Sequence, residues 1–270
     1  MCGLFGYAAI APARDPGLQD HHQPVPDAWV DRDGLRRLGL AAAAACRRGP
    51  DAWGYALYHG GSVFTNQHAG AFVYDSLHAS LSQFLAYRID TWATSLIGSG
   101  RLATSGSPED HTNNPPLRTD TVALVMNGVV RAHEQQILTA RFGLALQSGN
   151  DTEILGRLID HARWKMGHSF GQACQWATAQ LTPPFAALLL DLVDGHVFAT
   201  GHGQPLFALT VPGDGVYFTS RKPTRTDATR TGIDPSVGKV LTVTAKIDDL
   251  SNNMLMFQEA RRDRALPIAR

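Results

Sequence analysis

The first eleven residues, MCGLFGYAAIA (residues 1–11), decide the fold prediction because a cysteine at position 2 leads directly into an apolar run. Residues 3–10 predict a buried strand, which would anchor the N-terminus inside the fold instead of leaving a frayed tail. Gly3 and Gly6 leave space around the thiol for a substrate. The N-terminus is therefore a candidate functional site.

Cys2 would carry its own base if an aminopeptidase removed Met1. The thiol and the free α-amino group would then belong to one residue, with ordinary pKa values of about 8.5 and about 7.7–8.0. Such an amine can accept the thiol proton, directly or through water, without a histidine partner. Position alone leaves open a cysteine without a function, whereas the flanking glycines and the apolar strand favour a nucleophile.

Composition excludes several classes of protein. The chain has 270 residues, with 24 Lys and Arg against 24 Asp and Glu, and 44% of its residues are hydrophobic. Zero net charge excludes a nucleic-acid binder that relies on bulk positive charge, and the hydrophobic content excludes disorder throughout. Three cysteines do not make a disulfide framework, and no stretch approaches the roughly 18 uninterrupted apolar residues of a membrane span. We expect a cytoplasmic protein with no nucleic-acid or membrane partner.

Hydrophobic periodicity predicts strands, then a group of helices, then strands again. Helices are predicted over 33–48, with Asp33 as the N-cap, and over 76–88, 131–142, 152–166 and 169–180. Strands are predicted as a hairpin over 53–61 and 62–68, over 96–104 and 121–128, and over 185–193, 196–202, 205–211, 215–220 and 238–245. This order predicts two kinds of packed layer in a single domain over 1–258, followed by a charged tail over 259–270.

Four short motifs follow the N-terminal cysteine along the chain: RRGPDAWG (47–54), RLATSG (101–106), MNGVV (126–130) and GNDTEIL (149–155). Together with Cys2 they resemble the glutaminase domain of class II glutamine amidotransferases, which are N-terminal-nucleophile hydrolases. A weaker similarity continues through GHGQPLF (201–207) and FTSRK (218–222). The resemblance implies an α+β fold, a four-layer αββα sandwich, and a glutamine-hydrolysing enzyme.

The resemblance also implies a catalytic set. Cys2 matches the nucleophile that attacks the glutamine side-chain amide, forming a thioester and releasing ammonia. The side-chain NH2 of Asn127 and the backbone N–H of Gly128 match the oxyanion hole, where the loss of one donor typically costs about 2.7–4 kcal/mol. From the residues alone, Asn127 and Gly128 are also compatible with an ordinary turn.

A second set of residues matches the part of the family site that holds the substrate. Arg101 matches the residue that binds the α-carboxylate of glutamine through a bidentate fork, and Asp151 the one that receives its α-ammonium. Thr104 matches a hydroxyl that helps to align the substrate. Taken separately, Arg101 is also compatible with a surface charge at a strand end, and Asp151 with a helix cap.

The sequence departs from the family pattern at several positions. Asn114, before Pro115, stands where relatives often have His-Pro, and Ser105 stands where some have His, so the polar lining of the site differs. Trp53 replaces a small residue and is expected to narrow or reshape the floor near the thiol. Asp51 is expected to stabilise the loop of its motif and not to act as a catalyst.

No metal, cofactor or nucleotide site is expected. The histidines and cysteines lack HExxH or CxxC spacing, and the glycines form neither GxGxxG nor GxxxxGK[ST]. The predicted reaction is hydrolysis of L-glutamine to glutamate and ammonia, with a separate synthase subunit as the ammonia acceptor, because no block suited to acceptor activation is visible. Two alternatives stay open: a Cys-terminal amidase for another amide, such as an N-acyl or bile-salt-like amide, and a non-catalytic regulatory module of the same fold.

Overall fold

The computed structural model describes residues 2–9, 32–59, 61–77, 79, 94–211, 215–222, 229–234, 239–244, 246–251 and 254–257. The charged tail predicted over 259–270 lies outside these residues. So does most of the helix predicted over 76–88, of which residues 76, 77 and 79 are described and helical.

The N-terminal stretch forms the predicted strand, β1 (Gly3–Ala9), which lies inside a sheet and not at its edge. It pairs antiparallel with β10 (Gly215–Thr219) on one side and β4 (Thr94–Arg101) on the other. In the described residues this sheet has seven strands in the order β13-β9-β10-β1-β4-β2-β3. Its other strands are β2 (Ala52–His59), β3 (Ser62–Ala69), β9 (Phe207–Val211) and β13 (Lys246–Asp249).

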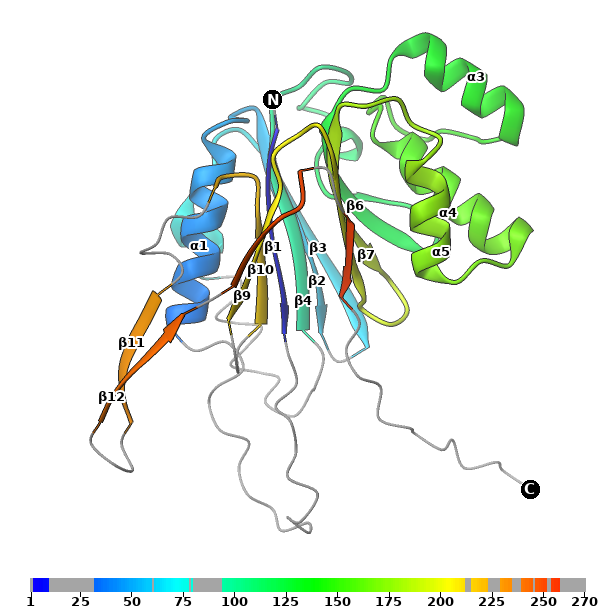
Figure 1. The fold of residues 1–270 in the computed structure, drawn as a ribbon. Coiled ribbons are helices and arrows are strands. Elements are labelled where there is room, and N and C mark those ends of the chain that lie inside the picture. Colours follow the sequence, from blue (N-terminus) through cyan, green and yellow to red (C-terminus); the bar gives the residue numbers. More distant parts are fainter. Residues whose placement is uncertain are drawn as a thin grey trace, which may run out of the picture.

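A second antiparallel sheet faces the first (Figure 1). Its described strands have the order β14-β8-β7-β6-β5. They are β5 (Leu117–Arg118), β6 (Val122–Gly128), β7 (Phe185–Asp191), β8 (Val197–His202) and β14 (Met254–Phe257). A further antiparallel pair, β11 (Thr229–Asp234) and β12 (Lys239–Thr244), forms a two-stranded sheet of its own.

Helices cover both outer faces of the paired sheets (Figure 1). The helix α1 (Arg32–Cys46) packs on the first sheet, while α3 (Ala132–Phe142), α4 (Glu153–Met166) and α5 (Phe170–Thr178) lie on the side of the second. The predicted four-layer αββα sandwich is confirmed. Because α1 begins at Arg32, Asp33 lies inside the helix, and its prediction as the N-cap is wrong. No helix in the described part of the chain combines the length and the apolar character needed to cross a membrane.

Alternating side chains make β1 part of two hydrophobic layers. Phe5 and Tyr7 belong to the cluster that includes residues of α1, whereas Leu4 and Ala8 belong to the cluster between the two sheets. The strand that follows Cys2 is therefore held from both faces, which fixes the position of the N-terminus.

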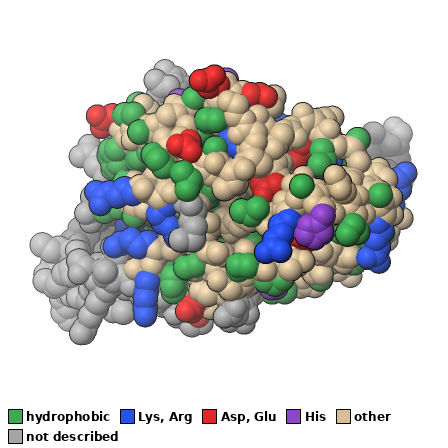
Figure 2. Space-filling view, turned by 90° about the horizontal axis from the view of Figure 1, so that it is seen from above, with side chains coloured by type: hydrophobic (Ala, Val, Ile, Leu, Met, Phe, Trp, Pro, Cys, Tyr) green, Lys and Arg blue, Asp and Glu red, His purple; other side chains and the backbone are tan. Residues whose placement is uncertain are grey.

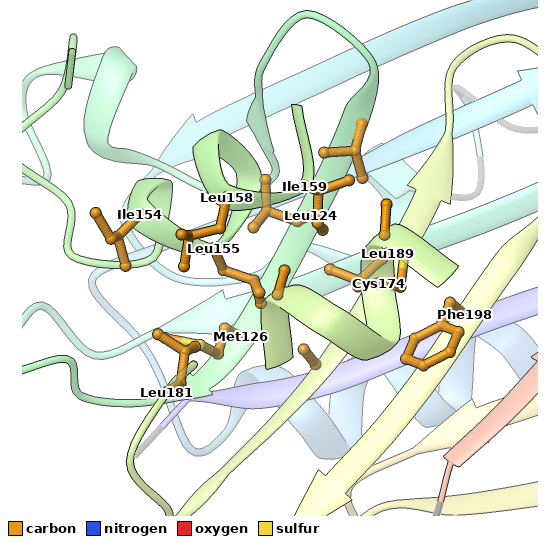
Figure 3. Packing of buried hydrophobic residues seen from close by; sticks show 14 of the residues in the cluster. Leu124, Met126, Ile154, Leu155, Leu158, Ile159, Cys174, Leu181, Leu189 and Phe198 are labelled. Atoms are coloured by element: carbon orange, nitrogen blue, oxygen red, sulfur yellow. The ribbon is translucent and has the colours of Figure 1, made fainter. Parts of the chain in front are cut away.

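The same alternation holds β6, the strand that ends at the Asn-Gly motif. Leu124 and Met126 pack with Leu189 of β7, Leu155 of α4 and Cys174 of α5 (Figure 3). The intervening residues of β6 belong to the cluster between the sheets. Close packing on both faces leaves little freedom for β6. Its last residues are therefore presented at a defined place at the end of the sandwich.

Candidate active site

Cys2 lies at the start of β1, at the end of the sandwich marked N in Figure 1. Gly3, the next residue, runs so close to the end of α1 that a Cβ built on it would lie 1.9 Å from the carbonyl oxygen of Ala45. A side chain at position 3 would therefore displace the strand that carries Cys2. Figure 2 looks onto this end, where hydrophobic, acidic and basic side chains are interspersed without a large area of one charge.

Ser220, directly after β10, ties the beginning of β1 in place. Its hydroxyl accepts a hydrogen bond from the backbone N–H of Leu4 at 3.0 Å, and its own N–H donates to the carbonyl of Leu4 at 3.0 Å. Sequence analysis identified FTSRK only as a weak family similarity and missed this role. The antiparallel pairing of Phe5 with Thr219 brings the two segments together, although 214 residues separate them in sequence.

The thiol of Cys2 is only partly accessible to solvent. Its Sγ donates a long hydrogen bond, 3.8 Å, to the carbonyl oxygen of Leu102. Burial raises the pKa of the Cys2 thiol above its ordinary value, and this effect outweighs the stabilisation of the thiolate by neighbouring groups that include Arg101. A thiol in this position is protonated at neutral pH, so a base has to remove its proton before it can attack a carbonyl.

Asn127 and Gly128 are the last two residues of β6. The side chain of Asn127 is 2% exposed, and its Nδ2 donates a hydrogen bond to Oε1 of Gln204 at 3.1 Å. Gly128 runs beside β7, where a Cβ built on it would lie 2.6 Å from Cβ of Phe185. Sequence analysis did not single out Gln204, because the family resemblance at GHGQPLF is weak and its partner lies 77 residues away.

Four of the predicted site residues line one cleft of about 330 Å³: Cys2, Thr104, Asn127 and Gly128. The other residues that line it are Leu102, Val129, Arg131, His133, Glu134, Thr182, Pro183, Pro184 and Gln204. The cleft therefore holds a thiol, a hydroxyl and an Asn-Gly pair at the end of a rigid strand. A substrate carbonyl in this cleft can lie close to both a nucleophile and hydrogen-bond donors.

The other two predicted residues, Arg101 and Asp151, line a smaller cavity of about 20 Å³, which Cys2, Thr104 and Gly128 also line. Arg101 ends β4 and is 4% exposed, whereas Asp151 lies just before α4 and is 5% exposed. Burial raises the pKa of Asp151, and hydrogen bonds together with the charge of Arg101 only partly offset it. The structure thus places the two opposite charges beside the thiol but outside the wider cleft.

Both charged groups already have partners within the protein. Arg101 donates to Oδ1 of Asn114 at 3.2 Å, to the carbonyl of Gly106 at 2.9 Å and to the carbonyl of Ser105. Asp151 accepts from the backbone N–H of Val130 at 2.8 Å and from the hydroxyl of Ser105 at 3.1 Å. Two of the positions that depart from the family pattern, Ser105 and Asn114, therefore hold the predicted substrate-binding pair.

Asp51 and Trp53, the two residues of the RRGPDAWG motif with a predicted role, have different surroundings in the structure. The Asp51 carboxylate accepts the backbone N–H of Ala103 at 2.8 Å, so its side chain holds the segment after β4 and not only the loop of its own motif. Trp53 instead stacks on His68 with ring centroids 4.2 Å apart, and its side chain belongs to the core on the α1 side. Because Trp53 lines neither cavity beside Cys2, its predicted role in shaping the floor near the thiol is wrong.

Glu153, in the first turn of α4, anchors the segment that leads to Asp151. Its carboxylate accepts hydrogen bonds from the backbone N–H groups of Gln147 and Ser148, from the Ser148 hydroxyl and from Arg157. Burial alone would raise the pKa of Glu153, but these four groups outweigh it and lower the pKa below its ordinary value of 4.5. Sequence analysis quoted Glu153 within GNDTEIL and gave it no role.

One group of side chains in the described residues has a spacing compatible with a metal ion: Asp191, the last residue of β7, with Asp194 and His196 of the connection to β8. The Asp191 carboxylate is buried and already forms an ion pair with Arg163 at 2.9 Å. It also accepts the backbone N–H of Val193. These contacts give the carboxylate a structural role, and no metal is assigned to it.

Several known proteins are similar to this chain in sequence. No family model matches. A glutamine–fructose-6-phosphate aminotransferase of Xylella fastidiosa is 31% identical over 223 residues, which cover 82% of this chain and 31% of that protein. The Shewanella oneidensis protein of the same name is 28% identical over 209 residues, covering 76% of this chain and 29% of the relative. The chain thus spans about 30% of the length of these relatives.

Solved structures support the fold independently. A structure described as the allosteric regulatory enzyme of purine biosynthesis matches 95% of this chain and 47% of its own, with a TM-score of 0.61 and 18% identity. The glutamine phosphoribosylpyrophosphate amidotransferase of B. subtilis matches 93% of this chain and 50% of its own, with a TM-score of 0.54 and 17% identity. At this identity, the likeness is evidence for the sandwich alone.

The four-layer sandwich, with a cysteine at the start of a central strand and an Asn-Gly pair lining the same cleft, is the arrangement that the resemblance to N-terminal-nucleophile hydrolases implies. Within that class, the sequence relatives confirm the resemblance carried by the motifs. The part of the chain that these relatives match resembles the glutaminase domain of class II glutamine amidotransferases.

Proposed function

We propose that this chain hydrolyses the side-chain amide of L-glutamine, with Cys2 as the nucleophile. The observation that carries the proposal is the single cleft lined by Cys2, Thr104, Asn127 and Gly128. A thiol alone would not indicate an amidase. A thiol beside an asparagine amide at the end of a packed strand can attack a carbonyl and stabilise the oxyanion that results.

The proposed reaction begins with the removal of Met1, which frees the α-amine of Cys2. That amine accepts the thiol proton, and Sγ attacks the amide carbonyl carbon. Asn127 Nδ2 and the Gly128 N–H stabilise the oxyanion. The protonated α-amine of Cys2 then gives its proton to the nitrogen of the substrate amide. The carbon–nitrogen bond breaks, ammonia departs, and a thioester remains on Cys2. Water hydrolyses the thioester, releasing glutamate and restoring the thiol.

Arg101, Asp151 and Thr104 are the residues we propose for binding the amino-acid end of glutamine. Opposite charges at Arg101 and Asp151 match the α-carboxylate and the α-ammonium, and both line a cavity next to Cys2. At about 20 Å³ this cavity has room for about one water molecule. Binding of glutamine therefore requires the segments that carry Ser105 and Asn114 to yield some of their hydrogen bonds to the two charged groups.

An amidase for a different amide is the second candidate, and one observation favours it. The charged pair is bound to the protein's own loops, and the wider cleft beside the thiol is lined by neither member of the pair. The two candidates differ in what the substrate must carry. Ammonia or amine release is measured with glutamine, with α-N-acetylglutamine, with glutamine α-methyl ester and with N-acyl amides. Rapid turnover of glutamine alone supports the glutaminase, whereas equal or faster turnover of the blocked compounds supports the other amidase.

A separate synthase subunit is the proposed acceptor of the ammonia. The relatives named above are aminotransferases about three times as long as the part that this chain matches. We propose that the partner docks near the Cys2 cleft, because free ammonia becomes protonated and is lost in water. We also propose a cytoplasmic reaction. Stoichiometric amination of an acceptor by the isolated 270 residues, without another protein, would exclude the separate partner.

A further inference from the structure

A glutamine side chain that lines the same cleft contacts the asparagine of the predicted oxyanion hole. Gln204 lies between β8 and β9 and lines the cleft together with Cys2. Its Oε1 accepts a hydrogen bond from Nδ2 of Asn127 at 3.1 Å, although 77 residues separate the two in sequence. The two side chains thus form a direct contact between different parts of the chain, within the pocket that contains the nucleophile.

The turn that carries Gln204 is braced by the backbone around Ser251. The N–H of Gly203 donates to the carbonyl of Ser251 at 2.8 Å, and the N–H of Leu206 donates to its hydroxyl at 3.4 Å. Leu250 also donates its N–H to the carbonyl of Leu206 at 2.8 Å. Residues on both sides of Gln204 are therefore fixed, so its side chain extends from a supported turn.

The orientation of the Asn127 amide matters because its two ends have opposite properties. The NH2 end has two N–H donors, whereas the oxygen end is an acceptor and would repel an oxyanion. With Gln204 accepting one N–H, the second remains available to the substrate. With the Gln204 amide in its observed orientation, rotating the Asn127 amide by half a turn would place Oδ1 of Asn127 against Oε1 of Gln204, two acceptors without a proton between them. Asn127 is 2% exposed, so bulk water cannot readily compensate for that loss.

We propose that Gln204 is a positioning residue that holds the Asn127 amide with its NH2 toward the reacting carbonyl. This inference rests on the proposed amide hydrolysis and deepens it. Because the oxyanion exists only after Sγ has attacked, a misdirected Asn127 should lower kcat and change KM little. We expect about a tenfold loss of kcat, less than for removal of Asn127 itself, since a freed amide still samples the productive orientation.

The test is a double-mutant cycle on glutamine hydrolysis by the full chain. Gln204→Met keeps the length of the side chain and removes the acceptor, and Asn127→Ala removes its partner. Gln204→Met is expected to lower kcat about tenfold in the wild-type background and to have no further effect in the Asn127→Ala background. Gln136→Met, on the exposed face of α3, is the matched control with unchanged activity. Thermal melting establishes that each variant is folded.

A second readout separates this inference from the proposed function. The side-chain NH2 signals of Asn127, identified by their loss in Asn127→Ala, are recorded by nuclear magnetic resonance with and without Gln204→Met. In Gln204→Met we expect the NH2 hydrogens of Asn127 to exchange faster, or the two NH2 signals to average. If the enzyme is active and Gln204→Met leaves kcat unchanged, the positioning role is overturned. It is also overturned if Gln204→Met lowers kcat by the same factor in the wild-type and Asn127→Ala backgrounds. A wild-type protein that hydrolyses no glutamine while its Asn127 signals still depend on Gln204 overturns the proposed function and leaves the contact intact.

Discussion

The guanidinium of Arg101 donates to Oδ1 of Asn114 at 3.2 Å, so a residue proposed to bind substrate is held by a residue at which this chain departs from its family. The same guanidinium donates to the carbonyls of Ser105 and Gly106. A planar group with five fixed donors can bind these loops in the free protein and direct donors toward the α-carboxylate of glutamine when some of the loop contacts yield. This geometry explains why the residue is arginine.

Arg101→Lys should therefore weaken glutamine binding although it conserves the charge. A lysine offers a point charge in place of a two-bond fork, and the loss of one hydrogen bond to a charged group costs about 1.5–3 kcal/mol. We expect KM for glutamine to rise about 10- to 100-fold with a smaller change in kcat. Steady-state kinetics measure both constants, and the control is Arg118→Lys, a substitution of an exposed arginine. If kcat/KM for glutamine is unchanged, Arg101 does not hold the α-carboxylate.

Asp151 should make glutamine binding depend on pH. Burial raises its pKa, so the carboxylate is protonated at a higher pH than an ordinary aspartate. Protonation removes the negative charge proposed to hold the α-ammonium, and binding should therefore weaken as the pH falls through this raised pKa. Calorimetric titration of glutamine into Cys2→Ala protein measures the affinity without turnover. Asp151→Asn in the same background should bind weakly, with no such pH dependence; a parallel pH dependence in both proteins would assign it to another group.

Glu153 should stabilise the fold only while it is ionised. Its pKa is below the ordinary value of 4.5, so its contribution is fully present above that value and is lost as the pH falls through the folded-state pKa. Glu153→Gln should lower the free energy of unfolding at pH 7 by about 3 kcal/mol, because it breaks a buried charged network. Urea unfolding from pH 7 to pH 3 should show the difference from wild type shrinking with acidity, whereas a constant difference would mean that the charge contributes nothing.

Asn127→Ala tests the oxyanion hole. Removal of one preorganised donor typically costs a factor of 100 to 1,000 in kcat. The variant should fold normally and show a loss of this size, with a smaller change in KM, because the donor acts mainly after the attack on the carbonyl. Stopped assays of ammonia release supply both constants. A large rise in KM with unchanged kcat would show that Asn127 binds the substrate in its ground state instead.

The four-layer sandwich was predicted from the family resemblance carried by the motifs, and the local hydrophobic patterns predicted many of its strands and helices. The apolar run after Cys2 became a central strand, and the glycine-punctuated runs after residue 183 became strands of both sheets. What could not be predicted depends on contacts between distant segments. Ser220 meets Leu4, and Gln204 meets Asn127, only after the sheets have paired. Trp53 was misplaced because alternation along β2 turns its side chain toward the core on the α1 side.

Mass spectrometry of an acid-quenched reaction tests the central claim most directly. Active protein is mixed with glutamine, quenched, and mapped by peptide analysis. The N-terminal peptide should begin at Cys2, without Met1, and a fraction of it should carry one γ-glutamyl group as a thioester. Cys2→Ala protein should carry none and release no ammonia. An active preparation that retains Met1 on every molecule, or a Cys2→Ala protein that releases ammonia at the wild-type rate, would contradict a nucleophile at Cys2.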